Sequence, residues 1–312
     1  MSSTDIVLGP HQYGKAEVRV VRVQRETEVH TLQDLNVTSL LRGDFDATFL
    51  SGDNSGVIAT DTQKNTVHAF AKERGISSPE EFLLELGRHF TAQPQVTGGR
   101  WQADAFTWER IQVPGPDGAP AGHDHSFVRN KDDVRTAAVT IEDGAEHVMG
   151  GFRDLTVLKS TGSEFHGFPR DRYTTLPETD DRIMATDITC RWLFRPGAAG
   201  GDGAGEMDYD AVYARAKQTV MEQFALVHSL SLQQTLYAAG QAVLEEVGDI
   251  EDIRFVMPNN HHYLVDLERF GLENHNEVFE AGVLPYGYMN ASVTRAGAEP
   301  RPKAWEWIAG FC

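Results

Sequence analysis

The order of expected strands and helices constrains the fold of this chain most, because the same order occurs twice. In each half two strands precede two helices, and further strands follow the helices. The strands expected in the first half are residues 15–25, 30–41, 99–111 and 125–141, and those in the second half are 155–160, 182–194, 253–258, 261–267 and 288–295. We therefore expect an α+β protein with two antiparallel sheets, helices on one face of each, and domains at 10–143 and 150–312.

Capping residues mark the helices of the first half. Thr60 followed by Gln63 fits a capping box, and Gly75 is placed to end that helix. Taken alone, this pattern makes Thr60 an N-cap. The next helix is expected to begin with Ser78 as N-cap and Pro79 at its first position. Its apolar stripe is formed by Phe82, Leu83, Leu86 and Phe90.

The loops of both halves and the helices of the second half are marked in the same way. Residues 114–122 in the first half and 197–205 in the second are rich in glycine or proline and are expected to be surface loops. The first helix after 197–205 has the apolar stripe Tyr209, Val212, Tyr213, Ala216, Val220 and Phe224. Ser231 with Gln234 fits a capping box that opens the next helix.

Composition narrows the function classes. The chain of 312 residues has 28 basic and 46 acidic residues, a formal charge of −18, which disfavours nonspecific binding to nucleic acid or to a membrane surface. No apolar run approaches the ~18 residues of a membrane span. Cys190 and Cys312 are the only cysteines, so a disulfide framework or a four-cysteine metal site within one chain is excluded. These features, with no secretory signal at the start and no Ser-Lys-Leu end, predict a cytoplasmic protein.

Conventional catalytic motifs are absent from the sequence, and two histidine clusters remain. There is no glycine-rich nucleotide motif, no Gly-x-Ser-x-Gly elbow and no His-Glu-x-x-His. His123 and His125 would share a strand face and could bind a metal, although a surface or subunit-contact role is favoured because spacing indicates no third ligand. His261 precedes His262 at an expected strand entrance, where a structural role is the alternative to chemistry.

Nine segments carry a more specific pattern. They are QYGK (12–15), DLNV (34–37), ATDTQKNT (59–66), LKSTGSEF (158–165), RDRYTTL (170–176), DRI (181–183), QQTLY (233–237), PNNHH (258–262) and IAGF (308–311). In this order they resemble the urate oxidase (uricase) family. The matches run from residue 12 to the C-terminus, so together they are far more specific than any single short motif.

The resemblance implies a fold and an activity. The fold would be the tunnelling fold, with two tandem ββααββ-like units per chain and a homotetramer that encloses a barrel-shaped channel. The family oxidises urate with O2 and water to 5-hydroxyisourate and hydrogen peroxide, with no metal or organic cofactor. The expected partners are therefore urate, O2 and three further copies of the chain.

The resemblance also implies roles for individual residues. The catalytic residues would be Lys15, Thr60 and His261. The substrate contacts would come from Thr60, Asp61, Phe165, Arg182, the backbone of Leu232, Gln233 and Asn259. Arg182 and Gln233 would hold one edge of the purine, Phe165 would stack on its face, and Asn259 would hold oxygen or water above it. Thr60 and Asp61 would come from a neighbouring subunit.

The chemistry of urate fits these residue types. Urate is a planar anion near neutral pH, and a guanidinium binds such an anion through paired, charge-assisted hydrogen bonds. Gln233 offers a donor and an acceptor, and its place in the first turn of a helix favours an anion. O2 needs an electron-rich substrate, so Lys15 would act as the base, Thr60 would relay the proton, and His261 would position or deprotonate water.

Departures from the family pattern and two rival functions remain. Asn260 stands where the family commonly has a lysine, which puts in doubt any tuning of His261 by that charge. One rival is a metal-dependent enzyme of the same fold that acts on a pterin or purine and uses His123, His125 and His261. The other is a purine-binding protein without catalysis.

Overall fold

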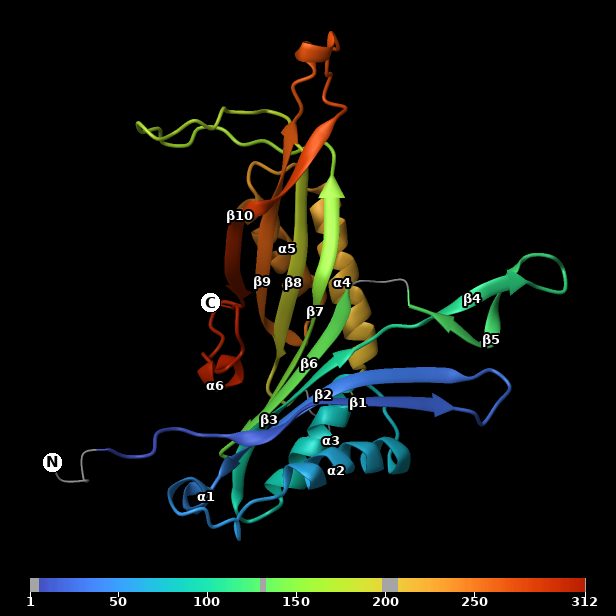
Figure 1. The fold of residues 1–312 in the computed structure, drawn as a ribbon, viewed down its shortest axis with the longest axis vertical. Coiled ribbons are helices and arrows are strands. Elements are labelled where there is room, and N and C mark those ends of the chain that lie inside the picture. The colour runs from blue at the N-terminus through green and yellow to red at the C-terminus, as the bar shows by residue number, and fades with distance from the viewer. Residues whose placement is uncertain (1–5, 130–132, 198–206, 312) are drawn as a thin grey trace. The chain divides into compact units, whose positions relative to one another are not determined.

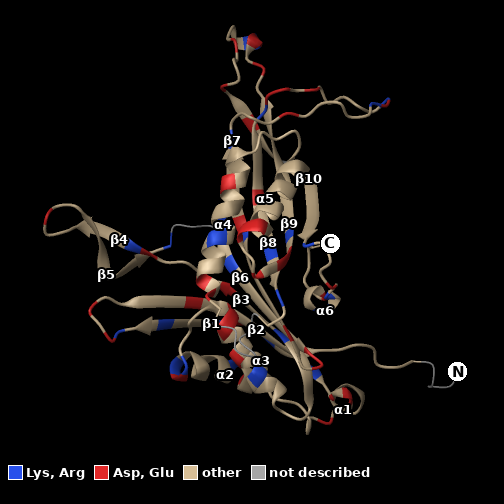
Figure 2. Ribbon diagram, turned by 180° about the vertical axis from the view of Figure 1, so that it is seen from behind, with Lys and Arg blue, Asp and Glu red and all other residues tan. Residues whose placement is uncertain are grey.

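The computed structural model describes residues 6–129, 133–197 and 207–311. The chain divides into two compact units (Figure 1). Unit 1 comprises residues 1–150, 193–210 and 301–306, and unit 2 comprises residues 151–192, 211–300 and 307–312. The acidic residues are spread over strands, helices and loops rather than gathered on one element (Figure 2).

Unit 1 is a four-stranded antiparallel arrangement with helices packed against its strands. Neighbouring strands follow the order β1-β2-β3-β6. Their bounds are Tyr13–Gln24 (β1), Thr31–Gly43 (β2), Val96–Ala105 (β3) and Val134–Glu142 (β6). The helices are α1 (Asp46–Leu50), α2 (Thr60–Glu73), α3 (Pro79–Thr91) and the short α6 (Pro302–Trp305). Helix α2 contacts β1, and α3 contacts β3 and β6, so the buried stripe of α3 forms the core of this unit.

Unit 2 repeats the element order. Its strands are neighbours in chain order, and they are β7 (Ala145–Lys159), β8 (Met184–Phe194), β9 (Ile250–Leu264) and β10 (Phe279–Thr294). Helices α4 (Tyr209–Leu226) and α5 (Leu232–Glu246) lie between β8 and β9 in the sequence, and the 3-10 helix η2 (Glu268–Phe270) lies between β9 and β10. Helix α5 contacts β9 and β10. The doubled order strand, strand, helix, helix, strand, strand is thus confirmed.

Helices α3 and α5 are equivalent in detail. Ser78 accepts a hydrogen bond from the backbone of Glu81, and Ser231 accepts one from Gln234, as the sequence predicted. Nine residues after each serine stands a glycine that lets its helix approach the sheet. A Cβ at Gly87 would lie 2.8 Å from Cδ1 of Ile141, and one at Gly240 would lie 2.7 Å from Cγ2 of Val293. Larger residues at either glycine would push helix and sheet apart.

The predicted role of Thr60 as an N-cap is wrong. Ala59 is the N-cap of α2, Thr60 is the first helical residue, and no side chain caps this end. The side chain of Gln63 does not turn back to the helix start, because its Oε1 accepts a hydrogen bond from the buried hydroxyl of Ser39 on β2 (2.9 Å). The end of the helix is as predicted, since Gly75 has a φ of +87° just after the C-cap.

Two expected strands of the first half are also wrong. Residues 99–111 do not form one strand, because β3 ends at Ala105 and a separate hairpin begins four residues later, formed by β4 (Glu109–Pro114) and β5 (Pro120–Val128). Residues 125–141 do not form one strand either, because β5 ends at Val128 and β6 begins at Val134. In the interval between β3 and β4, the Arg19 guanidinium covers the ring of Phe106 (3.9 Å), and the indole of Trp108 donates to Asp34 (2.9 Å). The expected loop 114–122 is therefore mostly the tip of this hairpin.

Strand β9 corrects a third expectation. The sequence suggested a break between two strands at the asparagines, yet β9 runs without interruption from Ile250 to Leu264. Asn259 pairs with Gly287 of β10, and the side chain of Asn260 donates to Asp187 (2.8 Å). Both asparagines are thus held inside a strand. The other glycine-rich loop expected, 197–205, lies outside the described residues from 198 onward.

None of the helices in the described part of the chain combines the length and the apolar character that a membrane crossing needs.

Candidate functional site

The predicted site residues form two groups, one in each unit. Unit 1 holds Lys15, Thr60 and Asp61. Unit 2 holds Phe165, Arg182, Leu232, Gln233, Asn259 and His261. We call these the base group and the purine group.

The base group is assembled by β1, β2 and the start of α2. Lys15 lies opposite Ser39 in the β1–β2 register, and Ser39 binds Gln63 in the first turn of α2. Hydrogen bonding to Lys64 lowers the pKa of Asp61 most, and the charge of Lys15 lowers it further. Lys15 is therefore close enough to the start of α2 to act electrostatically on it.

Thr60 has an exposed hydroxyl at the first position of α2. Because no side chain caps this helix end, the hydroxyl is not engaged in holding the helix. Within residues 6–129, 133–197 and 207–311 it has no hydrogen-bond partner. A hydroxyl in this state is able to accept a proton from one group and donate its own to another.

Arg182 is the central cation of the purine group. Its Nε donates to the hydroxyl of Ser163 (3.2 Å), and its backbone N–H donates to the Ser163 carbonyl (2.9 Å). Burial lowers the pKa of this half-buried guanidinium, which stays charged at any physiological pH. No carboxylate of the described residues lies within ion-pair distance of it. A half-buried cation that lacks an internal anion is a site for an external one.

An aromatic face accompanies the guanidinium. The Cζ atom of Arg182 lies 5.2 Å from the ring centroid of Phe165. Phe165 in turn stacks on Phe168, with ring centroids 5.0 Å apart and an interplanar angle of 14°. The pair supplies a flat apolar surface beside a positive charge, as a planar anion requires.

The start of α5 presents the Gln233 side chain for binding. Ser231 and Gln234 are occupied by capping, since Ser231 accepts from the backbone of Gln234 (3.1 Å) and the Gln234 amide accepts from the backbone of Leu230 (2.8 Å). Leu232 is buried and anchors the helix, whereas Gln233 is exposed. Its amide therefore stands at the positive end of a helix with its donor and acceptor available.

Asn259 and His261 share one face of β9, because they are two residues apart in a strand. Burial lowers the pKa of His261, and the charges of Arg182 and His262 lower it further. The imidazole is therefore neutral near pH 7 and able to accept a proton. The prediction of His261 at a strand entrance is wrong, because it lies within β9 opposite Gly282 of β10.

The histidine cluster of unit 1 has a member that the sequence did not indicate. His123 and His125 lie on β5 with ring centroids 4.5 Å apart, and His30 lies 5.8 Å from His125. His30 is distant in the sequence, so no spacing rule could have found it. Among the described residues no group of three or more His, Cys, Asp or Glu side chains is arranged to hold a metal ion.

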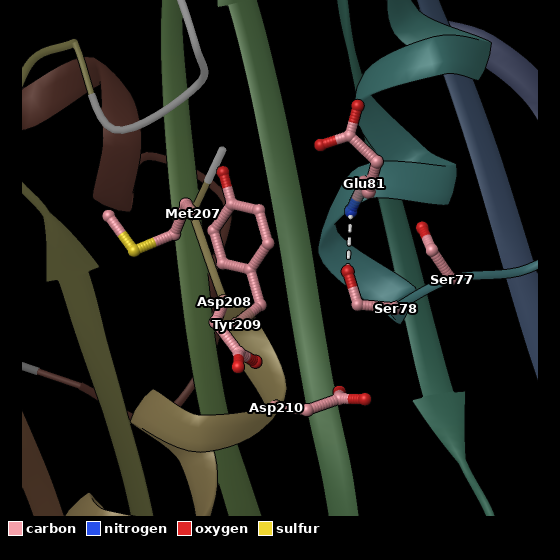
Figure 3. A pocket seen from close by; sticks show the side chains of 7 residues that line it. All are labelled: Ser77, Ser78, Glu81, Met207, Asp208, Tyr209 and Asp210. Carbon is pink, nitrogen blue, oxygen red and sulfur yellow. Dashed lines mark hydrogen bonds between the residues drawn. The ribbon is translucent and has the colours of Figure 1, made fainter. Parts of the chain in front are cut away.

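A cavity of about 300 Å³ lies elsewhere in unit 1 (Figure 3). Its lining consists of Ser77, Ser78, Glu81, Met207, Asp208, Tyr209 and Asp210. None of the predicted site residues is among them. Three of the seven are acidic, which opposes the binding of an anion such as urate.

Fold and site together define a class of protein. The chain has two ββααββ units, and the second carries a guanidinium with no carboxylate partner among the described residues, an aromatic face, a helix N-terminus and a neutral histidine, which suit a planar anion. A family model described as uricase matches residues 11–140 and 148–290. The chain belongs to the uricase family.

Individual relatives agree with this assignment. The uricase of Arthrobacter globiformis is 52% identical over 312 residues, which cover 100% of this chain and 97% of the relative. The uricase of Schizosaccharomyces pombe is 33% identical over 290 residues, which cover 91% of this chain and 96% of the relative. The crystal structure of the Arthrobacter globiformis uricase superposes with a TM-score of 0.87 at 52% identity, covering 96% of this chain and 98% of that one. A uricase from Bacillus fastidious, 24% identical with a TM-score of 0.78, covers 92% of this chain and 94% of its own and shows the same fold.

Proposed function

We propose that this protein oxidises urate with O2 and water to 5-hydroxyisourate and hydrogen peroxide, without a metal or organic cofactor. Membership of the uricase family supports the reaction. The observation that carries the site is Arg182, whose half-buried guanidinium has no carboxylate partner among the described residues and lies beside the Phe165 ring. Urate supplies the missing anion and a flat ring for the aromatic face.

Substrate binding is divided among the residues of the purine group. Arg182 donates paired hydrogen bonds to one edge of the urate anion, and the Gln233 amide reads the adjoining edge. The backbone N–H of Leu232, in the first turn of α5, adds a donor at the positive helix end. Asn259 holds O2 or water above the ring, on the strand face it shares with His261.

The reaction transfers two electrons from urate to O2. Removal of a further proton makes urate electron-rich, and Lys15 is the base, with the Thr60 hydroxyl as relay. O2 takes up two electrons and two protons and leaves as hydrogen peroxide. Water adds to the oxidised ring and becomes the 5-hydroxyl group, and the neutral His261 accepts the proton that this water loses.

We further propose that the active protein is a homotetramer. The base group and the purine group lie in different units of the chain. Thr60 and Asp61 of one copy complete the purine group of another, so that each active site is shared between subunits. Size-exclusion chromatography with light scattering measures the assembly. A monomer with full activity would contradict the shared site.

The first experiment measures O2 uptake together with the loss of urate absorbance, using chelator-treated enzyme. Equal consumption of the two, with formation of hydrogen peroxide, is the expected result. Urate binding without O2 uptake would leave a purine-binding protein and remove the catalytic assignment. Activity that returns only with added metal would favour the metal-dependent rival.

The proposed base is tested separately with Lys15→Met. The variant keeps the length of the side chain and removes the amine, so urate oxidation should slow by about 100-fold or more, the range of a lost general base. Urate binding under nitrogen should change much less. An oxidation rate equal to that of the unmodified protein at every pH would show that another group is the base.

A further inference from the structure

Two segments of unit 2 that carry residues of the purine group are joined at a pair of buried serines. Ser163 precedes Phe165 in one segment, and Ser229 precedes α5 and Gln233 in the other. The two serines form a short parallel bridge, in which the Ser229 N–H donates to the Gly162 carbonyl (2.9 Å) and the Glu164 N–H donates to the Ser229 carbonyl (2.7 Å). Both serines have 0% exposure.

The same serine pair reaches Arg182 directly. Ser163 binds Arg182 twice, through its hydroxyl (3.2 Å) and through its carbonyl (2.9 Å). A displacement of Ser163 therefore moves the guanidinium as well. On the other side, the hydroxyl of Ser229 contacts that of Thr235 in α5 (2.5 Å), so Ser229 and the helix that carries Gln233 move together.

Lys159 donates hydrogen bonds at the bridge between Ser163 and Ser229. It is the last residue of β7, and its ammonium donates to the Ser229 hydroxyl (2.5 Å), the Val227 carbonyl (2.7 Å) and the Phe224 carbonyl (3.3 Å). Two of these acceptors lie at the end of α4 or just after it, where carbonyls have no partner within the helix. One half-buried cation thus ties β7, α4 and the approach to α5 together, and burial lowers its pKa.

We propose that Lys159, acting through Ser229 and Ser163, is a positioning residue that sets the separation between Arg182 and Gln233 and thereby the affinity for urate. The inference rests on the proposed function, because urate is the ligand whose two edges these residues hold. Lys159 does not belong to the group that would contact substrate. Its effect reaches urate through three hydrogen-bonded steps, all within unit 2.

The test uses the full chain and measures urate binding by calorimetry under nitrogen, where no turnover occurs. Lys159→Met keeps the stem and removes the three donors, and the Kd for urate should rise about tenfold, since the hydrogen bonds of an ionised group are lost. Ser229→Ala breaks the same link with a smaller change and should raise Kd by about threefold. Lys72→Met, which removes an exposed lysine of α2, is the matched control with unchanged affinity.

A double-mutant cycle separates positioning from general loss of stability. In an Arg182→Lys background the geometry of the guanidinium is already gone, so Lys159→Met should weaken urate binding by a much smaller factor than in the unmodified protein. Equal factors in both backgrounds would overturn the inference. If Lys159→Met does not fold, Ser229→Ala is carried through the same cycle.

The outcomes distinguish the two proposals. Unmodified protein that binds no urate and consumes no O2 would overturn the proposed function, and the role of Lys159 with it. Unmodified protein that binds and oxidises urate, together with a Lys159→Met variant of equal affinity, would overturn the positioning role alone. A rise in KM that follows the rise in Kd, with kcat reduced less, supports it.

Discussion

Helices α3 and α5 begin in the same way at equivalent places of the two units, yet a buried acid stands in the first turn of α3 and an exposed amide in the first turn of α5. Each start has a serine cap, and the second helical residue is Glu80 in α3 and Gln233 in α5. Glu80 is fully buried and its carboxylate pairs with Arg135 (2.7 Å). Gln233 is exposed and uncharged, and Arg182 has no carboxylate within the described residues.

The two helix starts differ in whether a carboxylate of the chain meets the nearby arginine. The positive end of α3 and a nearby arginine are already satisfied by an anion that belongs to the chain. In unit 2 a neutral amide replaces that anion, so the helix end and the guanidinium remain available to an anion from solution. In α3 the charge is met within the chain, and at α5 we propose that urate meets it.

The largest effect is expected when the cation of unit 2 is removed. Arg182→Met should weaken urate binding by about 4 kcal/mol, roughly a thousandfold, because a charge-assisted bidentate contact is lost. Anaerobic calorimetry measures it. Arg135→Met is the matched change in unit 1 and should lower the free energy of unfolding instead, because it leaves the buried carboxylate of Glu80 without its cation.

The next prediction concerns pH and Glu80. Burial raises the pKa of Glu80 from 4.5 to about 7 in spite of Arg135. Between these pH values the folded state binds the proton of Glu80 more tightly than the unfolded state does. The free energy of unfolding of the protein therefore falls as pH rises, and the fall is complete above pH 7. From pH 5 to pH 8, Glu80→Gln should gain roughly 2 to 3 kcal/mol of stability relative to the unmodified protein. Urea midpoints at both pH values check it, and a difference independent of pH would contradict the buried carboxyl.

A smaller effect follows when α5 is given the residue type of α3. Gln233→Glu places a carboxylate beside Arg182, where it competes with urate and repels it, so binding should weaken by about 2 kcal/mol. The helix itself should be unchanged or slightly more stable, because an acid suits its first turn. Gln233→Ala is the control, and equal losses for both variants would show that the added charge has no part in the effect.

The smallest effects belong to the caps. Ser78→Ala and Ser231→Ala should each lower the free energy of unfolding by about 1 kcal/mol, the usual cost of losing an N-cap. Only Ser231→Ala should also weaken urate binding, since it loosens the turn that carries Gln233. Thermal unfolding of both variants measures the loss of stability, and urate titration measures the change in affinity. Equal urate affinity of the two variants would separate the cap from the site.

Local patterns predicted the helices better than the strands. The serine caps and the apolar stripes lie within a few residues of sequence, and the structure has them as expected. The break after Ala105 depends on Phe106 and Trp108 meeting Arg19 and Asp34, which are about seventy or more residues away. The capping box predicts Thr60 as the N-cap, whereas Thr60 is the first helical residue and Ala59 the N-cap. The side chain of Gln63 bonds Ser39 on β2 and does not complete the capping box.

The sequence alone determined the doubled element order, the family resemblance and the list of residues proposed to contact urate. Each of these depends on periodicity or on short segments, which local physics and recurring motifs encode. The tertiary structure decided that Glu80 is buried in an ion pair with Arg135. It also decided that Arg182 contacts Ser163 and Phe165 but no carboxylate of the described residues. Finally, it placed Lys159 in hydrogen-bond contact with Ser229, just before α5. The reason is that burial and ion pairing depend on which distant elements the packed sheet brings into contact, and no local pattern contains that information.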